Sequence, residues 1–144
     1  MRSAVAAAAV VLLAGGCTTT ATTDEAALER YQEANPLFSQ GRYAEAIPLY
    51  ESVVSVRDRL KDAHYKLAYC YEVRGEESRA VEALERALRV DPQDEYALRH
   101  LWRLYCHRGF VEQGLDAARR LSRLYPNDAG LKGEIARLES LKGK

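Results

Sequence analysis

Residues 61–94 read KDAHYKLAYCYEVRGEESRAVEALERALRVDPQD, and this stretch decides the fold. Apolar residues recur at helical spacing on both sides of Gly75, which predicts two amphipathic helices joined by a tight turn. Gly41, Gly75 and Gly109 follow one another at a constant interval of 34 residues. A fixed period of this length is typical of stacked repeats. The stretch is therefore predicted to be one module of an array.

The same pattern of two helices around a glycine occurs on both sides of this module. A first hairpin is expected over residues 24–60 and a third over residues 95–128. One further helix is expected over residues 129–144, with Asp128 as its N-cap. This last helix has one apolar face and one charged face, which suits a lid on the open end of a stack.

Two local features are expected in the first hairpin. Thr22 and Glu25 have the spacing of a capping box that opens the first helix. Pro36 lies inside the same helix and is expected to kink or split it near residues 32–35, because its ring clashes with the carbonyl group four residues earlier.

The middle module resembles the tetratricopeptide repeat (TPR), whose pattern is W-x2-L-G-x2-Y, then A-x3-F, then P. The matching residues are His64, Leu67, Ala68, Tyr71, Ala80, Leu84 and Pro92. The resemblance covers residues 27–128 and implies an all-α fold, a right-handed superhelical stack of three TPR helical hairpins plus a C-terminal capping helix. In the third module Trp102 stands at a small-residue position and Gly114 replaces alanine. We therefore expect Trp102 to pack over Gly114.

The N-terminus has the pattern of a targeting signal. Arg2 precedes an apolar run over residues 4–14 that is too short to span a membrane comfortably. The stretch Leu13-Ala14-Gly15-Gly16-Cys17 resembles a bacterial lipoprotein signal peptide with its lipobox, although the family prefers leucine where Ala14 stands. The resemblance implies removal of residues 1–16 and lipidation of Cys17. An ordinary secretory signal with a chance cysteine is the alternative.

The lipoprotein resemblance also implies a location. Two or more acyl chains on Cys17 give a stable membrane anchor. Residues 17–23 are rich in threonine and are expected to form a flexible tether. Thr18 is not the aspartate that favours inner-membrane retention in enteric bacteria, so the resemblance implies the outer membrane, facing the periplasm.

The TPR resemblance implies that the first helix of each hairpin lines a concave groove. The residues at groove positions are Tyr31, Asn35, Tyr65, Lys66, Tyr69, Tyr96, Arg99, His100 and Arg103. Residues 34 apart form rows along the groove, and the rows end on basic residues of the third hairpin. This arrangement predicts a receptor for an extended peptide, with an acidic stretch or a C-terminal carboxylate at the basic end. A solvated face with tyrosines packed between helices is the alternative.

One TPR function is not carried over. Chaperone-binding members of the family read a C-terminal carboxylate with a five-residue clamp. The residues at those positions here are Tyr31, Asn35, Lys66, Tyr96 and His100, and only Asn35 is the family residue.

Other function classes have little support. Lys plus Arg and Asp plus Glu number 21 each, which argues against nucleic acid as a partner. No nucleophile–base motif or phosphate loop occurs, so we expect neither an enzyme nor a small-molecule substrate or cofactor. His100, Cys106 and His107 lack the further ligands of a metal site. Cys70 and Cys106 are expected as buried free thiols, with a disulfide as the alternative.

The sequence therefore favours a lipid-anchored periplasmic adaptor or scaffold that binds a protein or peptide segment in the groove. The second hypothesis is a pilotin-like assembly factor for an outer-membrane or pilus complex. The third is self-association through the first repeat, which matches the family pattern least well.

Overall fold

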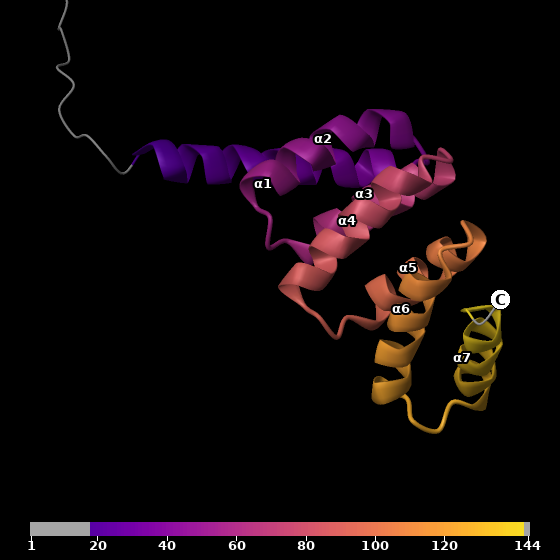
Figure 1. Cartoon of the computed structure of the whole chain (residues 1–144). Coiled ribbons are helices and arrows are strands. Elements are labelled where there is room, and N and C mark those ends of the chain that lie inside the picture. Colours follow the sequence, from indigo (N-terminus) through magenta and orange to yellow (C-terminus); the bar gives the residue numbers. More distant parts are fainter. Residues whose placement is uncertain (1–17, 143–144) are drawn as a thin grey trace, which may run out of the picture.

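The computed structural model describes residues 18–142, with side chains from Thr23 onward. Its helices are α1 (Thr18–Ser39), α2 (Tyr43–Val56), α3 (Lys61–Val73), α4 (Glu77–Val90), α5 (Glu95–His107), α6 (Val111–Leu124) and α7 (Ala129–Lys142). The pairs α1–α2, α3–α4 and α5–α6 form hairpins, and each hairpin packs against the next (Figure 1). This confirms the all-α stack of three hairpins with a capping helix.

The turn inside each hairpin depends on its glycine. Gly41, Gly75 and Gly109 have φ angles of 74°, 75° and 72°. This left-handed conformation is strained for residues with a Cβ atom. At the middle turn, the Glu76 N–H donates to the Tyr71 carbonyl at 2.8 Å, which closes the end of α3. The constant spacing of the glycines thus sets the length of each repeat, as predicted.

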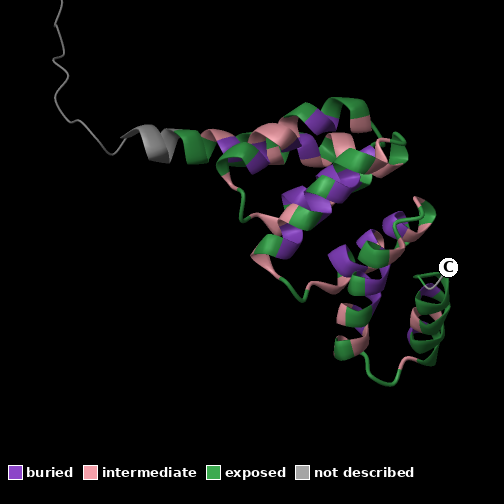
Figure 2. Ribbon diagram, in the orientation of Figure 1, coloured by how far each residue is buried: buried purple, intermediate pink, exposed green. Residues whose placement is uncertain are grey.

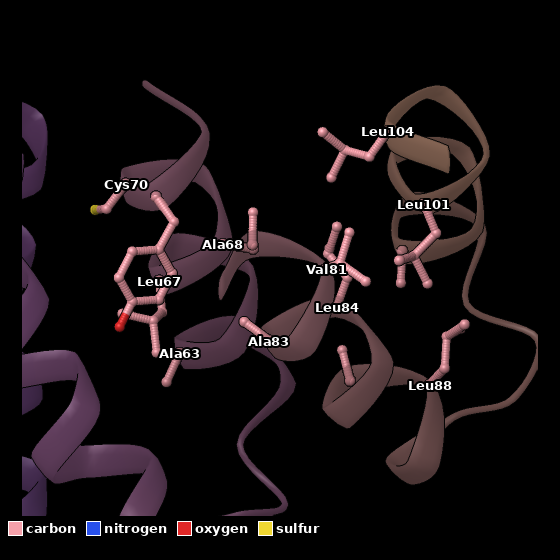
Figure 3. Close-up of a cluster of buried hydrophobic side chains, with 14 of the residues drawn as sticks. Ala63, Leu67, Ala68, Cys70, Val81, Ala83, Leu84, Leu88, Leu101 and Leu104 are labelled. Carbon is pink, nitrogen blue, oxygen red and sulfur yellow. The ribbon is translucent and has the colours of Figure 1, made fainter. Parts of the chain in front are cut away.

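Buried residues occur on each of the helices α1 to α7 (Figure 2). The buried face of α4 consists of Ala80, Val81, Ala83, Leu84, Ala87 and Leu88. Figure 3 shows Leu84 and Val81 beside Leu101 and Leu104 of α5, while Ala68 of α3 lies on the other side of the cluster. The alanines let the backbones of neighbouring helices approach closely, and the leucines fill the remaining volume.

Helix α7 occupies the place that the first helix of another hairpin would take. Arg119 on α6 bonds Glu139 on α7 at 2.7 Å, and these residues are 20 apart. One repeat earlier, Glu85 on α4 accepts a hydrogen bond from Tyr105 on α5, again at a separation of 20. Leu138 of α7 is 2% exposed and covers the end of the core. The predicted capping role of α7 is therefore confirmed.

The predicted helix ends agree with the structure at one end of the chain only. The Leu131 N–H donates to the Asp128 carboxylate at 3.0 Å, which confirms Asp128 as the cap of α7. At the other end, α1 already begins at Thr18. Residues 18–23, which the sequence predicts to be flexible, are helical, because a helix extends readily from a turn that is already formed.

Pro36 does not split α1. The helix continues through it to Ser39, three residues further on. Proline removes one backbone hydrogen bond near the end of this helix, and the adjacent Leu37 and Phe38 pack against the core. Their packing holds the last turn in place, so the predicted split is wrong.

The side chain nearest to Gly114 is that of Cys106 and not that of Trp102, which the sequence predicts there. A Cβ atom added to Gly114 would meet Cys106 Sγ at 3.1 Å and Tyr105 Cβ at 3.7 Å. Cys106 lies one turn after Trp102 on α5, so the register of the hairpin places the smaller side chain against the glycine. Trp102 is partly exposed and faces a pocket shared with Glu134 of α7.

The predicted signal peptide over residues 1–16 and the predicted lipidation site Cys17 lie outside the described residues. Within residues 18–142, no helix is both long enough and apolar enough to cross a membrane.

Candidate functional site

The predicted groove residues all lie on α1, α3 and α5, and each keeps part of its surface in solvent. The contacts among them fall into separate clusters, which bridge α1 to α3 and α3 to α5. Each pair of neighbouring first helices therefore presents its own cluster of polar or aromatic side chains.

Lys66 is the centre of the cluster between α1 and α3. Its Nζ donates to Asn35 Oδ1 at 2.8 Å and to the Tyr31 hydroxyl at 3.1 Å, and it lies 3.0 Å from the Asp62 carboxylate. The Tyr31 hydroxyl donates to Asp62 in turn. Asn35 Oδ1 accepts a second bond from the Tyr50 hydroxyl at 3.0 Å. The structure thus brings together three predicted residues, and it adds Asp62 as a local counter-charge.

Aromatic rings form the cluster between α3 and α5. The ring centroids of Tyr65 and Tyr96 are 4.8 Å apart, and Tyr96 stacks on His100 at 4.2 Å. Burial raises the pKa of Tyr65, with a further rise from the Asp94 carboxylate. Burial also raises the pKa of Tyr96, so both phenols stay protonated at neutral pH. They offer flat apolar surface but no charge.

The predicted basic end contains carboxylates that the sequence interpretation did not place there. Glu72 of α3 lies 3.0 Å from His100 Nδ1 and also bonds Arg103. Burial raises the pKa of Glu72, but His100 and Arg103 together outweigh burial and hold that pKa below its ordinary value. Arg99 Nε donates to Glu95 at 2.7 Å. The positive charge of this end is therefore partly compensated within the protein.

Tyr69 lies in a separate aromatic patch beside the turn between α1 and α2. Its ring centroid is 5.4 Å from that of Phe38 and 5.7 Å from that of Tyr43. The sequence interpretation did not assign Phe38 or Tyr43 to the surface of the groove. Both extend the aromatic surface toward the first hairpin.

Several of the contacting pairs follow a shorter interval than the 34-residue repeat. Tyr31 and Asp62, Tyr65 and Tyr96, and Glu72 and Arg103 are each 31 residues apart. Residues 34 apart hold equivalent places in successive repeats, but the side chains that meet are offset by about one helical turn. In the sequence, Asp62 lies 31 residues after Tyr31 and Glu72 lies 31 residues before Arg103, so a search at this interval would have found both carboxylates.

A pocket between α5 and α7 also escaped the sequence interpretation. It has a volume of about 440 Å³ and is lined by Arg99, His100, Trp102, Arg103, Cys106 and Glu134. Three of these are predicted groove residues. The pocket therefore joins the predicted groove residues of α5 to the capping helix.

The histidine and cysteine side chains outside the predicted groove are also candidate reactive groups, and the buried His64 has a structural role. His64 is fully buried, and its Nε2 lies 2.7 Å from the Asp58 carbonyl. Burial raises the pKa of Cys70 to about 11 and also raises the pKa of Cys106, so neither thiol is activated. Both thiols are free. Among residues 18–142, no group of three or more His, Cys, Asp or Glu side chains is placed to hold a metal ion.

Residues 37–101 match the sequence model of the family described as tetratricopeptide repeat. The chain therefore carries a TPR domain, as the resemblance of the middle module indicated. A curated relative is the probable UDP-N-acetylglucosamine–peptide N-acetylglucosaminyltransferase SPINDLY of Arabidopsis thaliana, 26% identical over 99 residues. That match covers 69% of this chain, and the chain spans about 10% of the length of SPINDLY.

Solved structures share the fold. The first TPR domain of Spaghetti, bound to an HSP90 peptide, has a TM-score of 0.64 and 19% identity, covering 84% of this chain and 96% of that one. The C-terminal TPR-containing domain of a putative FK506-binding protein of Plasmodium falciparum has a TM-score of 0.68 and 20% identity, covering 88% and 95%. The Yersinia enterocolitica secretion chaperone SycD, in complex with a peptide of the translocator YopD, has a TM-score of 0.62 and 16% identity, covering 81% and 93%.

Proposed function

We propose that this protein is an adaptor of the bacterial cell envelope, tethered through a lipidated Cys17 on the periplasmic side of the outer membrane. Its TPR groove holds an extended segment of a partner protein. Its role is binding rather than catalysis, and it needs no cofactor.

One observation carries the binding role. The partly exposed rings of Tyr65, Tyr96 and His100 contact one another in a row across α3 and α5, with Arg103 and Lys66 on neighbouring turns. Aromatic rings contribute contact area at a small cost in conformational entropy, and guanidinium groups recognise carboxylates with defined geometry. Spaghetti and SycD, which share the fold, are each bound to a peptide. These features support a peptide-binding surface formed by α1, α3 and α5.

Crosslinking in cells tests the binding role directly. A photoreactive amino acid is placed at position 96 or 103 in the groove, and at the exposed position 89 on α4 as the control. We expect a discrete crosslinked partner from positions 96 and 103 and not from position 89. The double change Arg99→Glu and Arg103→Glu should remove the crosslink at position 96. Equal adducts from all three positions would contradict a groove-based role.

Membrane fractionation tests the anchor separately. The Leu13–Cys17 stretch supports lipidation through its resemblance to a lipobox. The change Cys17→Ser removes the thiol that accepts the lipid, so the variant should leave the membrane fraction. Unchanged membrane attachment of this variant would refute lipidation and leave the proposed groove unaffected.

A further inference from the structure

The pocket between α5 and α7 is a product of one unusual residue. Trp102 holds the place that Ala34 and Ala68 hold in the earlier repeats, and those alanines are 0% and 1% exposed. A small side chain there lets the next helix close over it. The indole of Trp102 is partly exposed instead, and together with Glu134 of α7 it lines a pocket of about 440 Å³.

The charged groups around the indole favour an anion. Arg99 donates through Nε to Glu95, and Arg103 donates through one terminal nitrogen to Glu72. A guanidinium carries further N–H groups. Arg103 Nη2 also lies 3.3 Å from His100 Nδ1, whereas among the described residues the terminal nitrogens of Arg99, and Nε and Nη1 of Arg103, donate to no acceptor. Glu134 accepts two bonds from Arg137, which offset its negative charge. The pocket thus combines an apolar floor with unused donors on one wall.

These features define the occupant. An apolar side chain fits against Trp102 and Cys106, and a pocket of this size holds one or a few side chains rather than a folded partner. A carboxylate on the same residue satisfies Arg99 and Arg103. In a protein chain, only the C-terminal residue carries an α-carboxylate. A C-terminal residue with an apolar side chain therefore combines both features.

We propose that the pocket between α5 and α7 binds the C-terminal residue of the partner, with its apolar side chain against Trp102 and its α-carboxylate between Arg99 and Arg103. This inference rests on the proposed peptide groove and fixes the direction of the peptide in it. The C-terminus lies at α7, and the preceding residues run past Tyr96 and Tyr65 toward α1.

The sequence contains one tryptophan, so its fluorescence reports on the pocket. The whole protein in detergent is titrated with three pools of random hexapeptides that lack tryptophan. One pool ends in leucine with a free carboxylate, the second ends in leucine amide, and the third ends in serine with a free carboxylate. We expect a saturable change in Trp102 emission with the first pool, and about tenfold weaker binding of the other two.

Variants locate the binding without relying on the indole. Fluorescein-labelled peptides of the leucine pool are used in anisotropy measurements. The double change Arg99→Gln and Arg103→Gln should weaken binding about tenfold, because charge-assisted hydrogen bonds are lost. The double change Arg89→Gln and Arg123→Gln removes the same charge from exposed positions on α4 and α6 and should leave the affinity unchanged. Thermal melts of each variant show whether the fold is intact.

The outcomes separate the two proposals. Equal affinity for the free and amidated leucine pools, or an unchanged affinity after Arg99→Gln and Arg103→Gln, overturns the pocket inference. In that case loss of binding in Tyr96→Ala still supports the groove. Absence of binding by any pool overturns the groove and the pocket together.

Discussion

Glu72 of α3 holds two basic groups of α5 at once, because one of its oxygens lies 3.0 Å from His100 Nδ1 and the other bonds Arg103. The Glu72 side chain is only 13% exposed, whereas that of Arg103 is 59% exposed. A buried internal carboxylate therefore occupies a place in the groove where the carboxylate of a partner could otherwise bind.

This relationship predicts the effect of Glu72→Gln on binding. The change keeps the size of the side chain and removes the charge that competes for Arg103 and His100. Peptides with acidic residues should bind several-fold more tightly to the variant, with a steeper loss of affinity as salt is added. Peptide anisotropy at two salt concentrations measures both effects. Weaker binding of the same peptides would show that Glu72 supports the site instead of competing with its ligand.

The same variant predicts a pH dependence of stability. The pKa of Glu72 lies below its ordinary value in the folded protein. Its ionised form therefore stabilises the fold above the unfolded-state pKa of about 4.3, and this contribution is lost as the pH falls through the folded-state value. Glu72→Gln should lower the free energy of unfolding by about 1–2 kcal/mol near pH 7. Urea denaturation should show this difference shrinking below pH 4.

The buried His64 also predicts a loss of stability on acidification, and this loss begins at a higher pH than the one caused by Glu72. Its imidazole is fully buried, and burial lowers its pKa although the Asp58 carbonyl raises it. The unfolded chain therefore binds a proton near pH 6.5 that the folded chain does not, so stability falls as the pH drops through that value. Denaturation midpoints between pH 7.5 and 5.5 should decrease for the natural sequence. His64→Gln should flatten the profile, whereas His107→Gln, at an exposed histidine, should not.

Two glycines give opposite predictions for alanine. Gly75 has a φ of 75°, and a Cβ atom there meets no neighbour within 4 Å, so backbone strain is the only cost. Gly75→Ala should destabilise the protein by about 1 kcal/mol. Gly133 lies inside α7, also without a neighbour within 4 Å, and Gly133→Ala should stabilise by about 0.5–1 kcal/mol. Equal shifts in the same direction in thermal melts would contradict this assignment of the two backbone conformations.

Leu84 tests the core of the middle hairpin. Its side chain is 0% exposed and packs between α3 and α5 (Figure 3). Leu84→Ala removes this packing and leaves a cavity, so the free energy of unfolding should fall by about 2–5 kcal/mol. Leu28 on α1 is 42% exposed, and Leu28→Ala should change stability by less than about 0.5 kcal/mol. Urea denaturation of both variants measures the contrast.

The fold could be predicted from the sequence because its determinants are local. A left-handed turn at Gly75, an apolar stripe on α4 and a cap at Asp128 each depend on a few neighbouring residues. The extension of α1 through residues 18–23 was missed because threonines weakly disfavour a helix, and a turn that is already formed outweighs that preference.

The sequence predicted which residues form the candidate site, but not which of them contact one another. Rows of residues at an interval of 34 identify equivalent positions, whereas the stagger of the helices brings residues 31 apart into contact. This offset is a property of tertiary packing, so the pairing of Glu72 with Arg103 was missed. Within the third hairpin, the register of α5 and α6 places Cys106 nearest to Gly114, and the indole of Trp102 lines the pocket at α7.

Packing between the helices also has a consequence for how the chain folds. Each helix packs chiefly against the next one in sequence, from α1 to α7. Little loop-closure entropy is lost before such contacts form, so the contact order is low and folding should be fast. Each folded hairpin provides an apolar surface on which the next hairpin packs. A chain that becomes available from its N-terminus can therefore acquire its structure progressively, without waiting for its last residues.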